Sequence, residues 1–533
     1  MSRIKSGVVN DIYWANAQLE LRKEIKNWIT GAINRQKATP WRGGHDEGSY
    51  TCSWCNFYRL TGEDRIIQFL YWLRDTFRKW SMENQYHGFQ AEPREHSNHS
   101  FENAEEFLVS LCEMDPENEF NNMLIEDIAH HVGNWVEGIP EWYDWKRHRF
   151  VSHWVGTKGV RNEPPYDFEL AGHARIGTIV IQAYKATKNE RYIEWCKDYA
   201  GKWVDIIMNS EDKIPMVTYG TEFDDPEKRK EVYNFGRERV GDPYVGDVWK
   251  NITRHAVNFL MKVYELAPDP KYIEAVRKAI DIYEKANMEE RYLIELYMNY
   301  YACTGENYYK EKLDKWYKEN VEPALKVKQM LPNTMILTKK RSSEFDIGED
   351  TANVCKGPAR NFGTNDVYGN VSFYRGPTPA NYTKGYKISG NLECIERAMA
   401  LAACELFLTA YSTRDGREHG CESQRYIHGV GEEAVEALNE ATRIDVFDYF
   451  DAEGRLGLYE KVAVLADYED GEESAALYFY NYNNENKVVK IGMRDKEAQI
   501  KQATSDGTSC KMDGLLAQVE LPPKKVIKVE IKL

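Results

Sequence analysis

Residues 96–108 read His96-Ser-Asn-His99-Ser-Phe-Glu102-Asn-Ala-Glu-Glu-Phe-Leu108 and separate a polar stretch, 82–95, from an amphipathic helix. We expect the helix to begin at His99 or Ser100, because apolar residues then recur at helical spacing up to Leu111. Two imidazoles, an amide and a carboxylate therefore gather at one helix N-terminus, where unpaired N–H groups and the helix dipole favour negative charge. The alternative is a capped surface helix whose histidines are incidental.

Outward from this segment, the pattern predicts about twelve helices joined alternately by short turns and long loops. The expected helices include 16–36, 52–60, 65–80, 119–135, 272–286, 291–303, 308–326, 391–411 and 432–441, with a further helix opening at Arg254-His255. Short turns occur at Thr61-Gly62, Asp115-Pro116, Thr187-Lys188, Pro268-Asp269 and Thr304-Gly305. Helices joined by short turns are antiparallel neighbours, so the sequence favours an (α/α)6 toroid over an open α-solenoid.

From about Ile444 the hydrophobic period changes from helical to alternating. Segments such as 456–464, 475–482, 487–491 and 526–531 are separated by turns such as Glu469-Asp-Gly and Ser505-Asp-Gly. This pattern is typical of a small antiparallel β-sheet or sandwich. We therefore expect two domains, a toroid at 1–443 and a C-terminal β domain at 444–533.

Composition and charge restrict the class of protein. The formal net charge of −15 over 533 residues argues against nucleic acid or anionic membrane as a general partner. The sequence has no apolar run long enough for a signal peptide or a membrane span. The ten cysteines are scattered, mostly on helical apolar faces, and we interpret them as reduced side chains of a cytoplasmic protein. The one close pair, Cys52 and Cys55, is weak support for a metal site.

Most histidines lie in the long loops, which would form the ligand-binding face of a toroid. Eight of the twelve fall in, or at the end of, the first four long loops: His45, His87, His96, His99, His148, His153, His173 and His255. Histidine serves as acid, base or metal ligand, although polar loops also collect polar residues for no functional reason. The 35 tyrosines and 14 tryptophans suggest platforms for sugar rings.

Two chemistries suit a sugar-binding cleft. Glycoside hydrolysis needs paired carboxylates, and the candidates near helix starts are Asp46, Glu47, Glu102, Asp167 and Glu169. β-Elimination at a uronate needs a group that neutralises the substrate carboxylate, a base, and an acid for the leaving oxygen. The second set is better supplied, by Asn98-His99 and by the basic residues Arg147, Arg149, Lys158 and Arg161.

The segment Asn98-His99-Ser-Phe-Glu102-Asn103-Ala resembles the Asn-His-x-x-Glu-Asn segment that opens an inner helix in toroid polysaccharide lyases of the heparinase II/III and alginate-lyase type. The resemblance implies that Asn98 helps to neutralise the substrate carboxylate and that His99 transfers a proton. It also implies a catalytic tyrosine on the loop entering the next inner helix, a part that Tyr166 could play. The chain thus looks like a relative of (α/α)6-barrel carbohydrate-active enzymes.

The sequence therefore predicts a carbohydrate-active enzyme that cleaves an acidic oligosaccharide by β-elimination. Asn98 would act with Arg161 or Arg147, His99 would be the base, and Tyr166 or Tyr143 the acid. Glu102, Glu169 and His173 complete the catalytic candidates, with His173 and Arg175 alternatively bracing Glu169. The expected substrate-binding residues are His45, Glu47, Trp142, Arg147, His153, Arg161, Arg254, His255, Tyr374 and Arg375.

Several alternatives stay open. A glycoside hydrolase on the same scaffold would use two of the carboxylates named above. A sugar epimerase or isomerase, or a glycan-binding scaffold without catalysis, belongs to a different class. No cofactor is firmly expected, but His96, His99 and Glu102 could hold a divalent metal instead of relaying protons. The sequence does not identify the sugar, the linkage or the oligomeric state.

Overall fold

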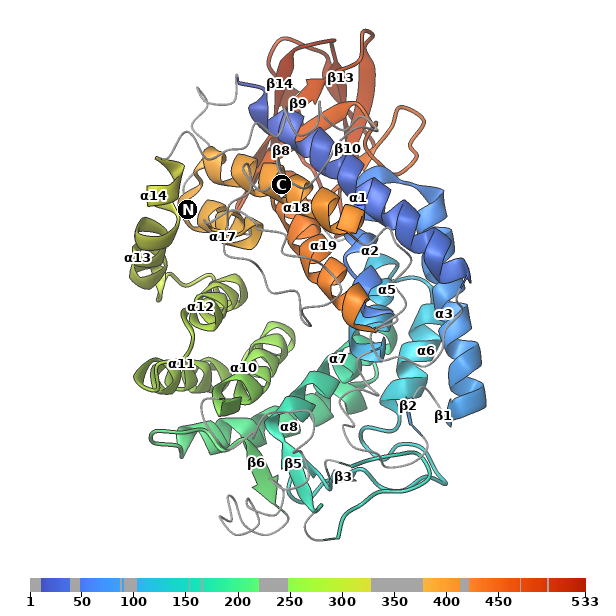
Figure 1. Cartoon of the computed structure of the whole chain (residues 1–533), viewed down its shortest axis with the longest axis vertical. Helices are drawn as coiled ribbons and strands as arrows, with labels where there is room; N and C mark the ends of the chain where they lie inside the picture. Colours follow the sequence, from blue (N-terminus) through green and yellow to red (C-terminus); the bar gives the residue numbers. More distant parts are fainter. Residues whose placement is uncertain are drawn as a thin grey trace. The chain divides into compact units, whose positions relative to one another are not determined.

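The computed structural model describes residues 11–38, 48–86, 89–90, 103–152, 154–163, 166–219, 248–326, 377–412, 421–469, 471–495 and 498–533 (Figure 1). The described chain is mainly helical, with antiparallel sheets near the C-terminus, as predicted. Chain contacts divide it into two compact units. The first comprises 1–40, 53–71 and 310–533, and the second comprises 41–52 and 72–309.

The helices of the first unit pack around α18 (Leu392–Ser412), which is in contact with α1 (Tyr13–Ala38), α17 (Pro379–Ser389) and α19 (Cys421–Thr442). This unit also contains α2 (Trp54–Thr61), α13 (Lys310–Asn320), α14 (Glu322–Leu325) and the first residues of α3 (Asp64–Asn84). Apolar residues of α18 such as Ile395, Ala398 and Ala402 are fully buried. The predicted helix 391–411 is therefore confirmed as α18, and α1, α17 and α19 pack against it.

Two four-stranded antiparallel sheets follow α19 in the first unit, drawn in orange to red in Figure 1. Their strand orders are β12-β13-β10-β7 and β11-β14-β9-β8. The bounds are β7 (Phe447–Phe450), β8 (Val462–Asp467), β9 (Ser474–Asn481), β10 (Lys487–Met493), β11 (Gln502–Ser505), β12 (Cys510–Asp513), β13 (Leu516–Leu521) and β14 (Val526–Lys532). In β14 the buried residues Ile527, Val529 and Ile531 alternate with more exposed ones, the pattern of a strand with one covered face.

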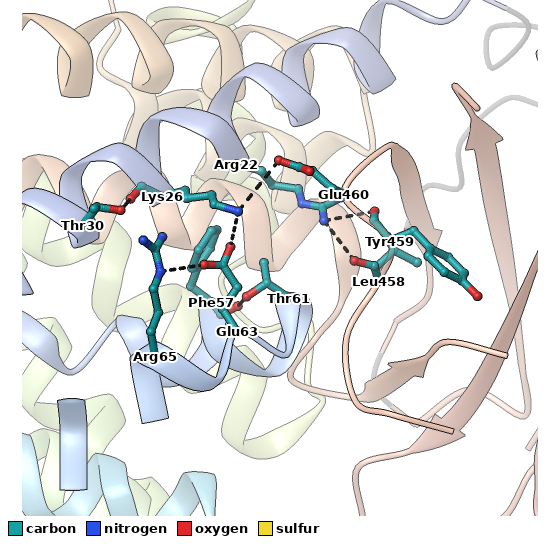
Figure 2. Close-up of polar contacts among 10 residues, drawn as sticks. All are labelled: Arg22, Lys26, Thr30, Phe57, Thr61, Glu63, Arg65, Leu458, Tyr459 and Glu460. Atoms are coloured by element: carbon teal, nitrogen blue, oxygen red, sulfur yellow. Dashed lines mark hydrogen bonds and ion pairs between the residues drawn. The ribbon is translucent and has the colours of Figure 1, made fainter. Parts of the chain in front are cut away.

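The sheets are fixed to the helices of the first unit by buried polar contacts from α1. The Arg22 guanidinium donates to the carbonyl oxygens of Val462 at 2.7 Å and of Leu458 and Tyr459 at 3.2 Å each, and Figure 2 shows the last two. Burial lowers the pKa of Arg22 to about 10, so the group stays charged at neutral pH. Lys26 pairs with Glu63 at 2.9 Å in the same region (Figure 2).

The backbone of the β region also touches the end of α2 directly. The Leu458 amide donates to the Leu60 carbonyl at 2.7 Å. Gly62 and Gly457 have φ of +63° and +115°, and a Cβ on Gly457 would lie 2.4 Å from the Thr61 carbonyl oxygen. Both positions therefore need glycine, for the backbone conformation and for the close approach.

The second unit contains the remainder of α3 and a series of short-linked helices. They are η1 (Ser49–Thr51), η2 (Asn103–Leu108), α5 (Val109–Met114), α6 (Glu119–Ala129), η3 (Ala171–Ile176), α7 (Gly177–Thr187), α8 (Glu190–Met208), α10 (Val248–Leu266), α11 (Pro270–Lys285) and α12 (Glu290–Thr304). Two short pairs of antiparallel strands accompany them: β1 (Gln85–Tyr86) with β2 (Phe89–Gln90), and β3 (Tyr143–Asp144) with β4 (Arg149–Phe150). A further pair joins β5 (Phe168–Leu170) to β6 (Val217–Tyr219).

The predicted short turns are confirmed by their caps. Lys188 and Gly305 end α7 and α12 in the left-handed conformation, with φ of +55° and +68°. The side chains of Asn189 and Asp269 accept hydrogen bonds from the first backbone amides of α8 and α11. The helix pairs α7–α8 and α10–α11 pack against each other, as helices joined by such turns must (Figure 1).

Two predicted boundaries are wrong. The helix expected over 119–135 ends at Ala129, because Gly133 packs under an indole ring and Asn134 has a φ of +60°. The helix expected to open at Arg254 begins at Val248, so Arg254 and His255 lie in its second turn. The start expected at His99 or Ser100 lies outside the described residues and stays a prediction; the described part of this helix begins at Asn103, where six residues form a π-helix before α5.

No helix among the described ranges is long and apolar enough to cross a membrane. No disulfide bond joins the cysteines whose side chains the structure describes.

Candidate active site

Two neighbouring carboxylates and one guanidinium meet in the second unit. Arg175 Nε donates to Glu105 Oε1 at 3.2 Å, and its Nη2 lies 2.9 Å from Glu105 Oε2. The same Nη2 donates to Glu106 Oε1 at 3.0 Å. Glu105 is thus held in a two-point contact, and both carboxylates converge on one nitrogen. We call Glu105, Glu106 and Arg175 the Glu105 cluster.

Local structure explains why these groups meet. Glu105 and Glu106 lie in the first turn of η2, where the helix dipole favours carboxylates, while Ala104, Phe107 and Leu108 are buried and anchor the turn. A π-turn widens the helix and is frequent at functional sites. Arg175 lies in η3, which leads directly into α7, and α7 packs against α5 and η2.

The cluster is partly enclosed, and its electrostatics follow from that. The side chains of Glu105, Glu106 and Arg175 are 13%, 34% and 23% exposed. Burial raises the pKa of Glu105 to about 7; Arg175 opposes this shift and Glu106 adds to it. Glu105 is therefore a carboxyl group that exchanges its proton near neutral pH while retaining a path to solvent.

His255 and Lys262, both on α10, complete the surroundings. Burial lowers the pKa of His255 to about 3, and the nearby charges of Arg175, Arg254 and Lys262 act in the same direction. The imidazole is therefore neutral and can accept or donate a hydrogen bond. Lys262 Nζ lies 3.0 Å from Thr178 Oγ1, and its charge opposes the raised pKa of Glu105.

A carboxyl group with a pKa near the working pH is suited to general acid catalysis. A second carboxylate beside it can stabilise a cation or act as a nucleophile, and a guanidinium can position both. Within the described residues no group of three or more His, Cys, Asp or Glu side chains could hold a metal ion. The two carboxylates and the guanidinium of the cluster have the composition of an acid–base site.

Glu169, a predicted catalytic residue, lies in the core of the second unit. It is 0% exposed and accepts hydrogen bonds from Tyr199 at 2.5 Å, from Thr218 at 3.1 Å and from Lys202. Burial lowers the pKa of Lys202 against the opposing charge of Glu169. All of these partners come from α8 and β6, so Glu169 connects elements of the fold and is not accessible to a substrate.

His173 lies beside this buried group and does not form the expected brace with Arg175. Its Nδ1 accepts a hydrogen bond from the Leu170 amide at 3.3 Å, and its ring is 5.1 Å from that of Phe150. Burial, aided by the charge of Lys202, lowers the pKa of His173 to about 3. The expectation that Arg175 supports Glu169 is wrong, because Arg175 binds Glu105 and Glu106.

Most of the predicted aromatic site residues are also buried. Tyr143 is 2% exposed, its pKa is raised by burial and by Glu169, and its hydroxyl has no hydrogen-bond partner within the described chain. Trp142 is fully buried and donates to the Gly156 carbonyl at 3.1 Å. Tyr166 is 7% exposed, with the Arg161 guanidinium carbon 3.3 Å from its ring centroid.

The predicted basic residues have local partners. Arg147 pairs with Asp144 at 2.7 Å, and Arg161 donates to Glu163 at 3.3 Å. Arg254 pairs with Glu295 at 2.7 Å. The structure therefore does not bring Arg147 and Arg161 to the Glu105 cluster, whereas His255 lies near Arg175 of that cluster.

The remaining predicted site residues lie outside the described residues or have side chains that are not described: His45, Glu47, His96, Asn98, His99, Glu102, His153, Tyr374 and Arg375. Sequence reasoning quoted Glu105 and Glu106 within the segment 96–108 but assigned them no role. An available signal was the pair of acidic residues in the first turn of that helix. Their guanidinium partner is 69 or more residues away in sequence and could not be identified from spacing.

Comparisons with known proteins do not assign a family. No protein-family model matches the chain, and no curated protein matches it. Among solved structures the chain is similar to a GH127 beta-L-arabinofuranosidase from Geobacillus stearothermophilus T6, with 11% identity and a TM-score of 0.27 over 98% of this chain and 80% of that one. At this identity and TM-score the likeness establishes neither fold nor function.

Proposed function

We propose that this chain is a glycoside hydrolase in which Glu105 is the general acid and Glu106 the second carboxylate. The observation that carries the proposal is the convergence of the two carboxylates on Arg175, with Glu105 the more enclosed of the two. Hydrolysis of a glycosidic bond needs one carboxyl group that donates a proton and one that stays charged. Enclosure favours the protonated form of Glu105, whereas the Glu106 side chain is more exposed to solvent.

The closeness of the two carboxylates favours a retaining over an inverting mechanism. Retaining enzymes need a short separation, because one carboxylate attacks the anomeric carbon directly, whereas inverting enzymes leave room for a water molecule. Two carboxylates that share one guanidinium nitrogen fit the shorter arrangement. Arg175 would hold both in register with the sugar, and neutral His255 would offer a hydrogen bond to a substrate hydroxyl.

β-Elimination at a uronate is the second candidate. It draws on Asn98 and His99, which lie outside the described residues, and on the Arg161 guanidinium stacked at 3.3 Å over the Tyr166 ring. Hydrolysis is preferred because Tyr166 is 7% exposed and Tyr143 is 2% exposed, so neither hydroxyl is readily reached by a substrate.

We also propose the (α/α)6 toroid over 1–443 and the β domain over 444–533 as the architecture. Its support within the second unit is the pair of short-linked hairpins α7–α8 and α10–α11. The change from helices to strands after Arg443 supports the domain boundary. An oligosaccharide substrate and a cytoplasmic setting belong to the same proposal. An experimental structure of the full chain tests the closure of the toroid.

A comparison of leaving groups tests the role of Glu105. Glu105→Gln should lower turnover of a natural oligosaccharide by about a hundredfold or more, because its leaving oxygen must be protonated. The same variant should retain most activity on a dinitrophenyl glycoside, whose leaving group departs as an anion. Glu106→Gln should lose activity on both substrates, and Glu113→Gln, an exposed residue of α5, is the matched control. Equal losses by Glu105→Gln on both substrates would contradict the assignment.

A further inference from the structure

An exposed tryptophan lies on the β3–β4 hairpin of the second unit, an element that contributes no residue to the Glu105 cluster. Trp145 is 39% exposed, and the other large apolar side chains that are as exposed within the described chain are Met123, Met208, Tyr308 and Leu515. Exposed apolar side chains that adjoin one another, rather than single ones, mark binding surfaces, and Trp145 adjoins the rings of Trp135 and Tyr143. Trp145, and not the buried Trp142, is the indole of this loop that a ligand can reach.

The Trp145 ring is held in a fixed orientation. Its Nε1 donates to the Gly133 carbonyl at 3.1 Å, and its ring packs edge-on against Tyr143 at 5.2 Å and Trp135 at 6.0 Å. Gly133 also lies directly under Trp135, where a Cβ would approach the indole to 2.4 Å. The two indoles are therefore positioned by one glycine, and the platform is formed before any ligand binds.

The backbone beneath the platform is fixed by Asn134. This residue has a φ of +60°, and its side chain accepts from the Trp142 amide at 2.7 Å and the Tyr143 amide at 3.0 Å. The side-chain amide nitrogen of Asn134 donates to the Tyr143 carbonyl at 2.7 Å. Three hydrogen bonds thus join the segment that carries Trp135 to the hairpin that carries Trp145. Such preorganisation lowers the entropic cost of binding.

Polar groups border the aromatic surface. The Arg191 guanidinium carbon lies 5.5 Å from the Trp135 ring centroid, and Arg191 pairs with Glu126 at 3.6 Å. Glu126 also accepts from the Tyr192 hydroxyl at 3.0 Å and lies 3.7 Å from His130. The side chains of Arg191, Glu126 and His130 are 34%, 31% and 32% exposed, so they can still bond to a ligand.

We propose that Trp145 and Trp135, bordered by Glu126 and Arg191, form a surface site that binds a sugar ring of a polysaccharide chain. A sugar ring has an apolar C–H face, which packs on an indole, and a rim of hydroxyl groups, which bond to a carboxylate and a guanidinium. The platform offers a matching surface, with indole rings at its centre and polar side chains at its edge. A protein partner would need about 800 Å² on each side, whereas Lys146 and Arg147 beside Trp145 interrupt the apolar surface.

This site would hold the polysaccharide on the surface of the protein and would take no part in bond cleavage. Its residues come from α6, the 133–145 segment and the start of α8, and the Glu105 cluster comes from η2 and η3. Binding through the platform therefore can be measured without turnover, and a failure of the hydrolase assignment would leave this inference unaffected.

Affinity electrophoresis tests the inference directly. The full-length protein is run through native gels containing arabinan, xylan, polygalacturonate, alginate, galactomannan or mixed-linkage β-glucan. The wild-type protein should be retarded in at least one gel, and Trp145→Ala should weaken that retardation by about tenfold or more. Trp145→Phe keeps a ring and should recover part of it. Tyr308→Ala removes another exposed aromatic side chain, 58% exposed on the loop after α12, and should behave as the wild type.

Three results would overturn the inference. One is the absence of retardation in every gel, and another is equal retardation of the wild-type protein and Trp145→Ala. The third is a change of oligomeric state in Trp145→Ala by sedimentation, which would assign the platform to contact between copies of the chain. Circular dichroism of each variant confirms that it is folded before the gels are compared.

Discussion

The replacement Glu105→Gln should remove a pH-dependent loss of stability. Burial raises the pKa of Glu105 from an ordinary 4.5 to about 7, and one unit of pKa corresponds to about 1.4 kcal/mol. Between these two values the folded chain binds more protons at this site than the unfolded chain. Stability therefore falls as pH rises through this window, and the full penalty, about 3 kcal/mol, is present above pH 7.

Glutamine is nearly isosteric with glutamate and does not titrate. The unfolding free energy of Glu105→Gln minus that of the wild type should therefore become more positive by about 3 kcal/mol between about pH 4.5 and about pH 8. Urea denaturation followed by circular dichroism at several pH values measures this difference. Other titrating groups cancel, since they are common to both proteins.

Glu113→Gln is the control, because this carboxylate is 53% exposed on the neighbouring helix. Its difference from the wild type should vary little with pH. A difference for Glu105→Gln that is independent of pH would refute the reasoning, because it would mean that Glu105 ionises equally easily in the folded and unfolded chains. A difference that becomes more negative as the pH rises would mean that Arg175 lowers the pKa of Glu105 by more than burial raises it.

Two further predictions concern the fold. Gly457→Ala should lower the unfolding free energy by more than about 3 kcal/mol, because the new Cβ would meet the Thr61 carbonyl and the residue would have a φ of +115°. Gly454→Ala, at a φ of +83° with no atom within 4 Å of the new Cβ, should cost only about 1 kcal/mol. Equal effects of the two variants in urea denaturation would show that the contact with Thr61 is unimportant. Glu169→Gln should cost about 3–5 kcal/mol by leaving Lys202 buried without its counter-charge. The added change Lys202→Met should restore much of that loss, and a double variant no more stable than Glu169→Gln would contradict this explanation.

The parts of the fold that local chemistry determines were predictable. Gly305 and Asp269 end and begin their helices through side-chain and backbone properties that are present in the sequence itself. The alternation of buried residues in β14 likewise follows from the sequence. The end of α6 could not be predicted from the sequence. It depends on the packing of Gly133 under Trp135, and that contact exists only in the folded chain.

The site was harder to predict, because burial decides it. Glu169 and Tyr143 have the right chemistry for catalysis, but packing against α8 places both in the core. Glu105 became distinctive only through its enclosure and through Arg175, which lies 70 residues away in sequence. The segment 96–108 that the sequence singled out does contain Glu105 and Glu106, which lie in the first described turn of its helix.

Product analysis in water labelled with heavy oxygen tests the central claim most directly. The protein is incubated with a panel of neutral and uronate oligosaccharides, and each product is examined by mass spectrometry and ultraviolet absorbance. Hydrolysis through the Glu105 cluster predicts new reducing ends that carry one labelled oxygen, no absorbance from a new double bond, and loss of the labelled reducing ends in Glu105→Gln. Products that absorb in the ultraviolet and carry no label would contradict the hydrolase and establish elimination.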